Sequence, residues 1–179
     1  LNNLSKENAD LFEANLLLGL YEQLRGNFKD SEKYFMKLNF PAEGNFYYEN
    51  LLGNILNMWS KASQGKDSEA QKYLEVIPAK YEIFKTLQRP LLSCFFKKND
   101  TEVGFEKFIN SESVNFARYR YLYINYLVRN QKFDKAAIVI EDATNQYENN
   151  LLVKQTFKDF KDKKFSKIKN TFNCKMLDH

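Results

Sequence analysis

The stretch that decides the fold is residues 116–147, FARYRYLYINYLVRNQKFDKAAIVIEDATNQY. Apolar side chains recur in both of its halves at spacings of three and four, which is the period of one helical face. In the first half these are Tyr119, Leu122, Tyr123, Tyr126 and Leu127, and in the second half Phe133, Ala136, Ala137, Ile140 and Ala143. A polar Asn-Gln-Lys corner separates the halves. The stretch therefore predicts a helical hairpin.

The hairpin pattern recurs along the chain. Equivalent corner residues of the predicted hairpins are Phe28, Asp67, Thr101, Phe133 and Phe165, which lie 39, 34, 32 and 32 positions apart. A near-constant step of this size indicates a repeated supersecondary unit. We expect five hairpins in a single domain, over residues 9–40, 46–77, 79–110, 115–147 and 150–175. Six glycines and three prolines in 179 residues also favour helix over a chain of β-turns.

Glycine and proline give local detail. Gly19 and Gly26 lie seven residues apart in the first hairpin, where they predict a close contact between its helices and a sharp exit from the first helix. Pro90 lies inside the first helix of the third hairpin. Proline removes one backbone hydrogen bond, so we expect Pro90 to kink this helix or to divide it after Gln88.

The residues of these units resemble the tetratricopeptide repeat (TPR), whose unit is about 34 residues. The resemblance is carried by Leu18-Gly19, Gly26-Asn27-Phe28, Ser31 and Phe35 in the first unit, and by Phe133, Ala136 and Ile140 in the fourth. The order of residues 57–62 (NMWSKA), 64–67 (QGKD), Arg118, Leu127, Arg129 and Lys135-Ala136 is similar to uncharacterised TPR proteins of alphaproteobacteria. Asn99, Gln131 and Lys163 depart from the pattern, because they stand where the repeat has its corner glycine.

The resemblance implies an all-α fold, a right-handed α-solenoid of about five antiparallel helix pairs, with a concave wall lined by first helices. First-helix positions that point away from the paired second helix predict this wall. They are Arg118, Tyr121, Asn125 and Arg129 in the fourth unit, Arg89, Ser93 and Lys97 in the third, and Trp59 in the second. Because guanidinium groups can engage two oxygens at once, we expect a protein or peptide ligand with an acidic or C-terminal segment. A solvated helix face is the alternative interpretation.

Charge is concentrated at the end of the chain. The whole chain has a formal charge of +4, but residues 154–179 hold eight lysines and three aspartates, so this tail carries +5 and the rest −1. Phe157, Phe160, Phe165, Ile168 and Phe172 interleave with these lysines. Such a segment is typical of a final repeat with a polar outer face, and the alternative is a basic amphipathic helix at an anionic membrane or an assembly partner.

The sequence offers few groups for catalysis. Its only histidine is His179, so no histidine-based metal cluster or catalytic triad can be assembled. It contains no glycine-rich phosphate-binding motif. We therefore expect a non-catalytic protein without cofactor, metal or small-molecule substrate. Nucleic acid is not expected either, because the equivalent wall positions Leu16, Ile55, Arg89, Tyr121 and Val153 do not form a base-reading code.

Two cysteines complete the inventory. Cys94 is expected to be a small buried side chain and Cys174 to lie near a frayed end, so no disulfide is predicted. Unpaired cysteines favour a reducing compartment, so we expect a cytoplasmic location, with the periplasm as the alternative. No apolar run approaches the roughly 18 residues that span a bilayer.

Overall fold

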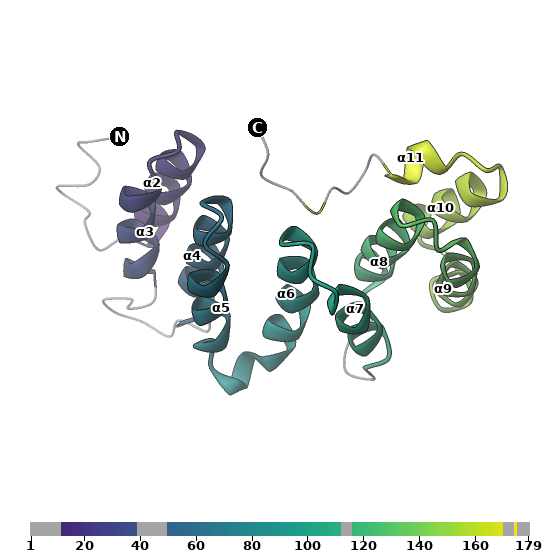
Figure 1. Cartoon of the computed structure of the whole chain (residues 1–179), viewed down its shortest axis with the longest axis horizontal. Coiled ribbons are helices and arrows are strands. Elements are labelled where there is room, and N and C mark those ends of the chain that lie inside the picture. The colour runs from purple at the N-terminus through teal and green to yellow at the C-terminus, as the bar shows by residue number, and fades with distance from the viewer. Residues whose placement is uncertain (1–11, 39–49, 112–115, 170–173, 175–179) are drawn as a thin grey trace. The chain divides into compact units, whose positions relative to one another are not determined.

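The computed structural model describes residues 12–38, 50–111, 116–169 and 174. Every regular element in these ranges is a helix (Figure 1), which confirms the all-α prediction. The α-helices are α2 (Phe12–Leu24), α3 (Phe28–Lys37), α4 (Leu52–Ser63), α5 (Asp67–Glu75), α6 (Glu82–Phe95), α7 (Thr101–Ile109), α8 (Ala117–Arg129), α9 (Phe133–Gln146), α10 (Leu151–Lys161) and α11 (Phe165–Lys169), and a 3-10 turn, η1 (Ala79–Tyr81), precedes α6.

The chain divides into two compact units, Leu1–Leu92 and Ser93–His179, with the boundary inside α6. In the first unit, α2 packs with α3, α4 packs with α5, and α3 also contacts α4. In the second unit, α8 contacts α7 and α9, α10 contacts α8 and α9, and α11 contacts α8 and α10 (Figure 1). Most of these contacts join helices that are adjacent in the chain, and in the second unit α8 also packs with α10 and α11. That all five hairpins form a single domain stays a prediction.

Five corners between helices share one backbone geometry. Each contains a residue with a positive φ angle: Gly26 (75°), Gly65 (74°), Lys97 (55°), Gln131 (60°) and Lys163 (56°). The next amide donates to the carbonyl five residues before it, over 2.8–3.0 Å, and the positive-φ residue donates to the carbonyl three residues before it. This pair of bonds is the Schellman motif, which satisfies the last carbonyls of a helix. One local solution therefore ends α2, α4, α6, α8 and α10.

The third corner corrects the predicted register. The sequence prediction placed the equivalent of the corner glycine at Asn99, but the positive φ belongs to Lys97. Three residues separate Lys97 from the start of α7 at Thr101, whereas a single residue separates the equivalent pair at the other corners. The Thr101 hydroxyl donates to the Lys98 carbonyl over 2.7 Å and closes this longer turn. The third corner thus contains two residues more than the others. The sequence prediction missed them because it aligned this corner at Thr101.

Helix α6 runs through Pro90 without interruption. Of the two predicted outcomes, division after Gln88 is therefore wrong. Pro90 itself is buried, and Leu87, Leu91 and Leu92 around it are buried as well. Burial of these leucines stabilises the helix by about 1.5–3 kcal/mol for each side chain, which offsets the lost backbone hydrogen bond.

The core is formed mainly by aromatic and aliphatic residues in the middle of the helices. Phe108 and Tyr123 are each 1% exposed, which agrees with their predicted core role. Phe28, Trp59 and Phe133, expected beside them, are only partly buried. Phe28 and Phe133 open their helices at a corner, where neighbouring helices cover one side only. Deeper residues fill the core instead, among them Phe35, Met58, Leu74, Leu92, Phe105, Leu127 and Ile140.

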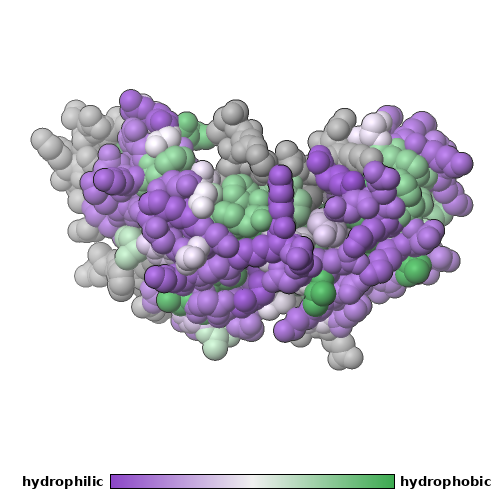
Figure 2. Space-filling model, in the orientation of Figure 1, coloured by the Kyte–Doolittle hydropathy of each residue, from purple (hydrophilic) through white to green (hydrophobic). Residues whose placement is uncertain are grey.

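The surface shown in Figure 2 is largely hydrophilic, and its hydrophobic side chains form separate patches. Within the described ranges, none of the helices combines the length and the apolar character needed to cross a bilayer.

Candidate functional site

Two of the predicted wall residues, Trp59 and Arg89, lie in the first unit. Trp59 of α4 is partly buried, and its Nε1 donates to Oε1 of Gln88 in α6 over 2.9 Å. Arg89 of α6 is exposed, and its Nη2 lies 2.9 Å from Oε1 of Glu75 at the end of α5. Both side chains therefore link neighbouring helices of this unit.

Four more, Arg118, Tyr121, Asn125 and Arg129, lie on α8 in the second unit. Arg118 and Arg129 are exposed, and Tyr121 is partly buried beside Ile140 and Val153 of the following helices. Asn125 is fully buried: its Nδ2 donates to the carbonyl of Ile168 in α11, and its Oδ1 accepts from Nε of Arg129 over 3.3 Å. The four side chains do not form one open face, because α11 covers α8 at Asn125. Asn125 has a structural role, and Arg129 remains at the surface.

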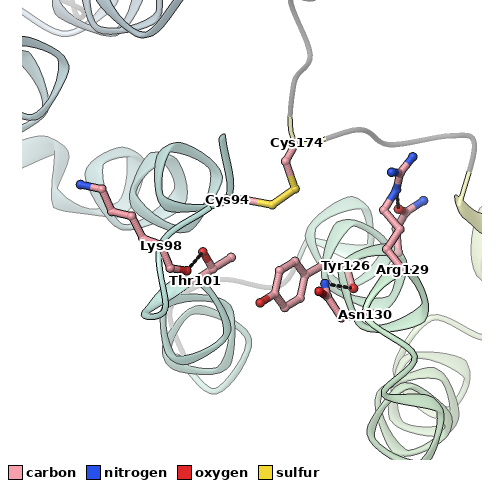
Figure 3. Close-up of a disulfide and its surroundings, with 8 residues drawn as sticks. Cys94, Lys98, Thr101, Tyr126, Arg129, Asn130 and Cys174 are labelled. Atoms are coloured by element: carbon pink, nitrogen blue, oxygen red, sulfur yellow. Dashed lines mark hydrogen bonds between the residues drawn. A yellow bond between two sulfur atoms is a disulfide. The ribbon is translucent and has the colours of Figure 1, made fainter. Parts of the chain in front are cut away.

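Arg129 lines a pocket at the ends of the helices, where it meets Lys97 from the preceding hairpin. We call this the corner pocket. Its volume is about 650 Å³, and its lining residues are Cys94, Phe95, Lys97, Lys98, Asn99, Thr101, Glu102, Tyr126, Arg129, Asn130, Lys132 and Cys174. Figure 3 shows the disulfide, Tyr126 and Arg129 around this region. The structure therefore brings together Lys97 and Arg129 of the predicted wall, whereas Ser93 is buried in α6.

Two corners supply half of the residues that line the pocket. The α6–α7 corner contributes residues 97–99, and the α8–α9 corner contributes residues 129, 130 and 132. Local bonds hold both corners: Thr101 donates to the Lys98 carbonyl over 2.7 Å, and Nδ2 of Asn130 donates to the Tyr126 carbonyl over 2.8 Å (Figure 3). Because both corners are fixed by Schellman bonds and side-chain caps, the pocket is built on ordered backbone.

The disulfide between Cys94 and Cys174 forms part of the pocket lining, with the two Cα atoms 5.4 Å apart (Figure 3). The prediction of unpaired cysteines is therefore wrong. Cys94 lies in the last turn of α6 and Cys174 lies beyond α11, at a sequence separation of 80, so only the fold brings them together. The argument for a reducing compartment rested on unpaired thiols and no longer holds.

The corner pocket is cationic. Lys97, Lys98, Arg129 and Lys132 oppose a single carboxylate, Glu102, so the lining carries a formal charge of +3. Glu102 accepts hydrogen bonds from Lys132 and from Lys135 of α9. These bonds, the one from Lys132 first, lower the pKa of Glu102 and keep it ionised. The one acidic group of the lining is therefore already bound to two lysines.

Charged residues that the sequence reasoning missed stabilise the second unit. Arg120 of α8 is buried, forms an ion pair with Asp142, and donates to Oε1 of Gln146 over 2.9 Å. A sequence signal for this burial existed, because Arg120 lies three and seven positions before the core residues Tyr123 and Leu127. That spacing places it on the buried face of α8.

The predicted final repeat has a definite packing. The ring of Phe165 stacks on Phe133 of α9, with centroids 4.6 Å apart, and contacts Phe160 at 5.4 Å. Ile168 is buried as well. The lysines at 158, 161, 163, 164 and 167 are exposed. Apolar side chains of α10 and α11 thus pack toward the previous hairpin, and Phe172 lies outside the described residues.

The described part of the chain contains no cluster of three or more histidine, cysteine, aspartate or glutamate side chains that could hold a metal ion.

Comparison of the chain with protein-family models, with curated proteins and with solved structures finds no match.

Proposed function

We propose that this chain is a non-catalytic protein-interaction scaffold of the TPR type, which binds a peptide segment of a partner protein. The observation that carries the proposal is the recurrence of one corner geometry at Gly26, Gly65, Lys97, Gln131 and Lys163. These residues are separated by 39, 32, 34 and 32 positions. Repetition of a helical hairpin at this period is typical of α-solenoid scaffolds, which bury their apolar faces by stacking.

A recurring contact between hairpins supports stacking of this kind. The residue five positions before the positive-φ residue is Ser60 in α4 and Tyr126 in α8. The Ser60 hydroxyl lies 3.4 Å from that of Ser31 in α3, and the ring of Tyr126 lies 5.6 Å from that of Phe105 in α7. In each unit, this position of a first helix thus meets the second helix of the preceding hairpin. We propose on this basis a right-handed solenoid of about five helix pairs.

We propose that the partner segment binds the second unit along the exposed part of α8, from Arg118 to Arg129 and the corner pocket. Asn125 is not part of this surface, because it is buried against α11. The two arginines supply forked donors to carboxylate oxygens of a peptide.

Affinity purification with the full chain from its native host tests the scaffold proposal. Arg118→Ala combined with Arg129→Ala is expected to lose a partner that the wild type retains. Lys154→Ala combined with Lys158→Ala is the matched control, because both lysines are exposed on α10. Undiminished capture of every partner by the arginine variant contradicts the proposed surface.

The disulfide bears on the compartment. Disulfides persist in oxidising environments and are rare in the cytosol. We therefore propose a compartment such as the periplasm over the cytoplasm.

The membrane-adaptor alternative has less support, because Phe160, Phe165 and Ile168 of the basic tail pack inside the second unit. Liposome flotation before and after removal of residues 154–179 separates the two functions: unchanged flotation eliminates the adaptor.

A further inference from the structure

We propose that the corner pocket is a specific binding site for an acidic peptide segment, whose side-chain carboxylates bind Lys97 and Arg129. The inference rests on the proposed scaffold function, since the ligand is a peptide segment of a partner. It narrows the recognition site to the corner end of α8, where Lys97 and Arg129 of the predicted wall meet. It also makes the Cys94–Cys174 disulfide part of the site.

The lining of the corner pocket carries an excess of positive charge. Four cations and one carboxylate line the pocket, and the carboxylate of Glu102 is held by Lys132 and Lys135. A concave site with a surplus of one sign of charge concentrates ligands of the other sign. Carboxylates gain further from charge-assisted hydrogen bonds, which are about twice as strong as neutral ones.

Two of the basic residues in the pocket occupy the same position of the repeated corner. The residue after the positive-φ position, which donates the longer Schellman bond, is lysine at four of the five corners: Lys66, Lys98, Lys132 and Lys164. In the second unit this repetition puts Lys98 and Lys132 into one pocket, where Lys97 and Arg129 add to them. Two neighbouring corners thus bring four basic residues to the lining of one cavity. The ammonium of Lys98 lies over the ring of Phe96, 5.9 Å from its centroid, and its side chain points away from the disulfide (Figure 3).

The volume and the lining residues of the corner pocket suit a short peptide segment. A volume of about 650 Å³ lies within the range of about 300–1,000 Å³ that is usual for ligand pockets. Phe95 and Tyr126 provide apolar surface for the methylene groups of glutamate, and the amides of Asn99 and Asn130 can pair with a peptide backbone. The pocket therefore offers apolar surface and hydrogen-bonding groups beside its basic residues.

An acidic peptide fits better than nucleic acid. Binding of single-stranded nucleic acid requires a basic groove that follows the backbone over several nucleotides. The corner pocket is instead a local cavity, and its lining includes the disulfide and the ionised carboxylate of Glu102. The first turns of α7 and α9 also carry acidic residues, Glu102 and Asp134, which would repel the phosphates of a nucleic acid.

The test uses the purified full chain and a fluorescein-labelled hexaglutamate peptide, followed by fluorescence anisotropy at low ionic strength. Lys97→Gln combined with Arg129→Gln is expected to weaken binding by about tenfold or more, which corresponds to about 1.4 kcal/mol. Lys154→Gln combined with Lys158→Gln is the matched control, because it removes the same charge from exposed positions outside the pocket. The control is expected to change the affinity less than about twofold. Circular dichroism checks that both variants are folded. The combination of Lys97→Gln with Lys98→Gln is a second pocket variant, which leaves the hydrogen bond between Arg129 and Asn125 intact.

Three results overturn the inference. The first is that the wild-type chain does not bind the hexaglutamate peptide, and the second is that the pocket and control variants weaken peptide binding equally. The third is that an oligouridylate probe binds more tightly than the peptide and that the pocket variants abolish this binding. Failure of the peptide probe with intact capture of a host partner rejects the pocket but leaves the scaffold function. Binding of the probe without capture of any host protein supports the pocket but rejects the scaffold function.

Discussion

Gly19 of α2 packs against the ring of Phe35 in α3, nearest to its Cε1 and Cδ1 atoms. A Cβ atom at position 19 would come within 2.5 Å of Cδ1 of this ring, and closer still to Cε1. Phe35 is 1% exposed, so its ring has little room to move. The contact confirms the prediction that Gly19 lets the two helices approach, and it fixes the packing of the first hairpin.

Gly19→Ala is therefore expected to destabilise the first unit by about 1–3 kcal/mol, the usual cost of overpacking a core. Urea unfolding followed by circular dichroism measures the change. Gly26→Ala provides the comparison, because no atom lies within 4 Å of the site of its Cβ and its only cost is the positive φ angle, about 1–2 kcal/mol. If Gly19→Ala unfolds like the wild type, the close contact does not exist.

Lys97→Gly is expected to stabilise the chain by about 0.5–1 kcal/mol. Glycine adopts the left-handed backbone conformation of Lys97 without the steric cost that a side chain adds, although it loses more entropy on folding. Asn99→Gly, at the position that the sequence alignment equated with the corner glycine, should instead be neutral or destabilising. Denaturation midpoints of the two variants decide between the two registers: a stabilising Asn99→Gly would contradict the corner described above.

Reduction of the Cys94–Cys174 disulfide is expected to lower the free energy of unfolding of the second unit by about 2–4 kcal/mol, since the bond closes a loop across 80 positions. Thermal melts with and without reductant measure this loss. The double variant Cys94→Ser with Cys174→Ser should show no response to reductant. Alkylation of both thiols in folded, unreduced protein, detected by intact mass, would show that the bond is not formed.

Glu102→Gln is expected to cost about 0.5–1 kcal/mol at neutral pH, the usual range for partly exposed ion pairs. Hydrogen bonds from Lys132 and then Lys135 lower the pKa of Glu102 in the folded chain. The carboxylate therefore stabilises the fold fully above its ordinary pKa of 4.5, and this contribution is lost as the pH falls through the lowered value. The variant should accordingly show a shallower loss of stability on acidification than the wild type.

Denaturant unfolding at about pH 7 and about pH 3 tests this prediction, with Glu148→Gln, an exposed site, as the control. Equal acid dependence in Glu102→Gln and the wild type would show that the lysine contacts do not stabilise the fold.

The hairpins could be predicted from the sequence because helical periodicity and corner residues are local signals. The predicted corner residues Phe28, Asp67, Thr101, Phe133 and Phe165 each lie at the start of a helix in the structure. The third corner was misplaced at Asn99 because its two additional residues leave no trace in composition. The register depends on a positive φ angle that Lys97 adopts at a steric cost, so the residue type does not reveal the position of the corner.

The candidate site was less accessible to sequence reasoning. Arg129 and Lys97 were both expected on the wall, but their meeting in one pocket depends on the packing of successive hairpins. Asn125 was expected beside them, yet α11 buries it. The Cys94–Cys174 pairing depends on a fold that spans 80 positions. Contacts of this range are properties of the tertiary structure, which no local pattern encodes.

The most direct test of the central claim is cross-linking mass spectrometry of the full chain in its native host, with a reagent that joins lysine to carboxylate. The account predicts cross-links from Lys97, Lys98 or Lys132 to an acidic segment of one partner protein, which disappear in Lys97→Gln with Arg129→Gln. Partners attached only to lysines outside the corner pocket, such as Lys154 or Lys158, would contradict it.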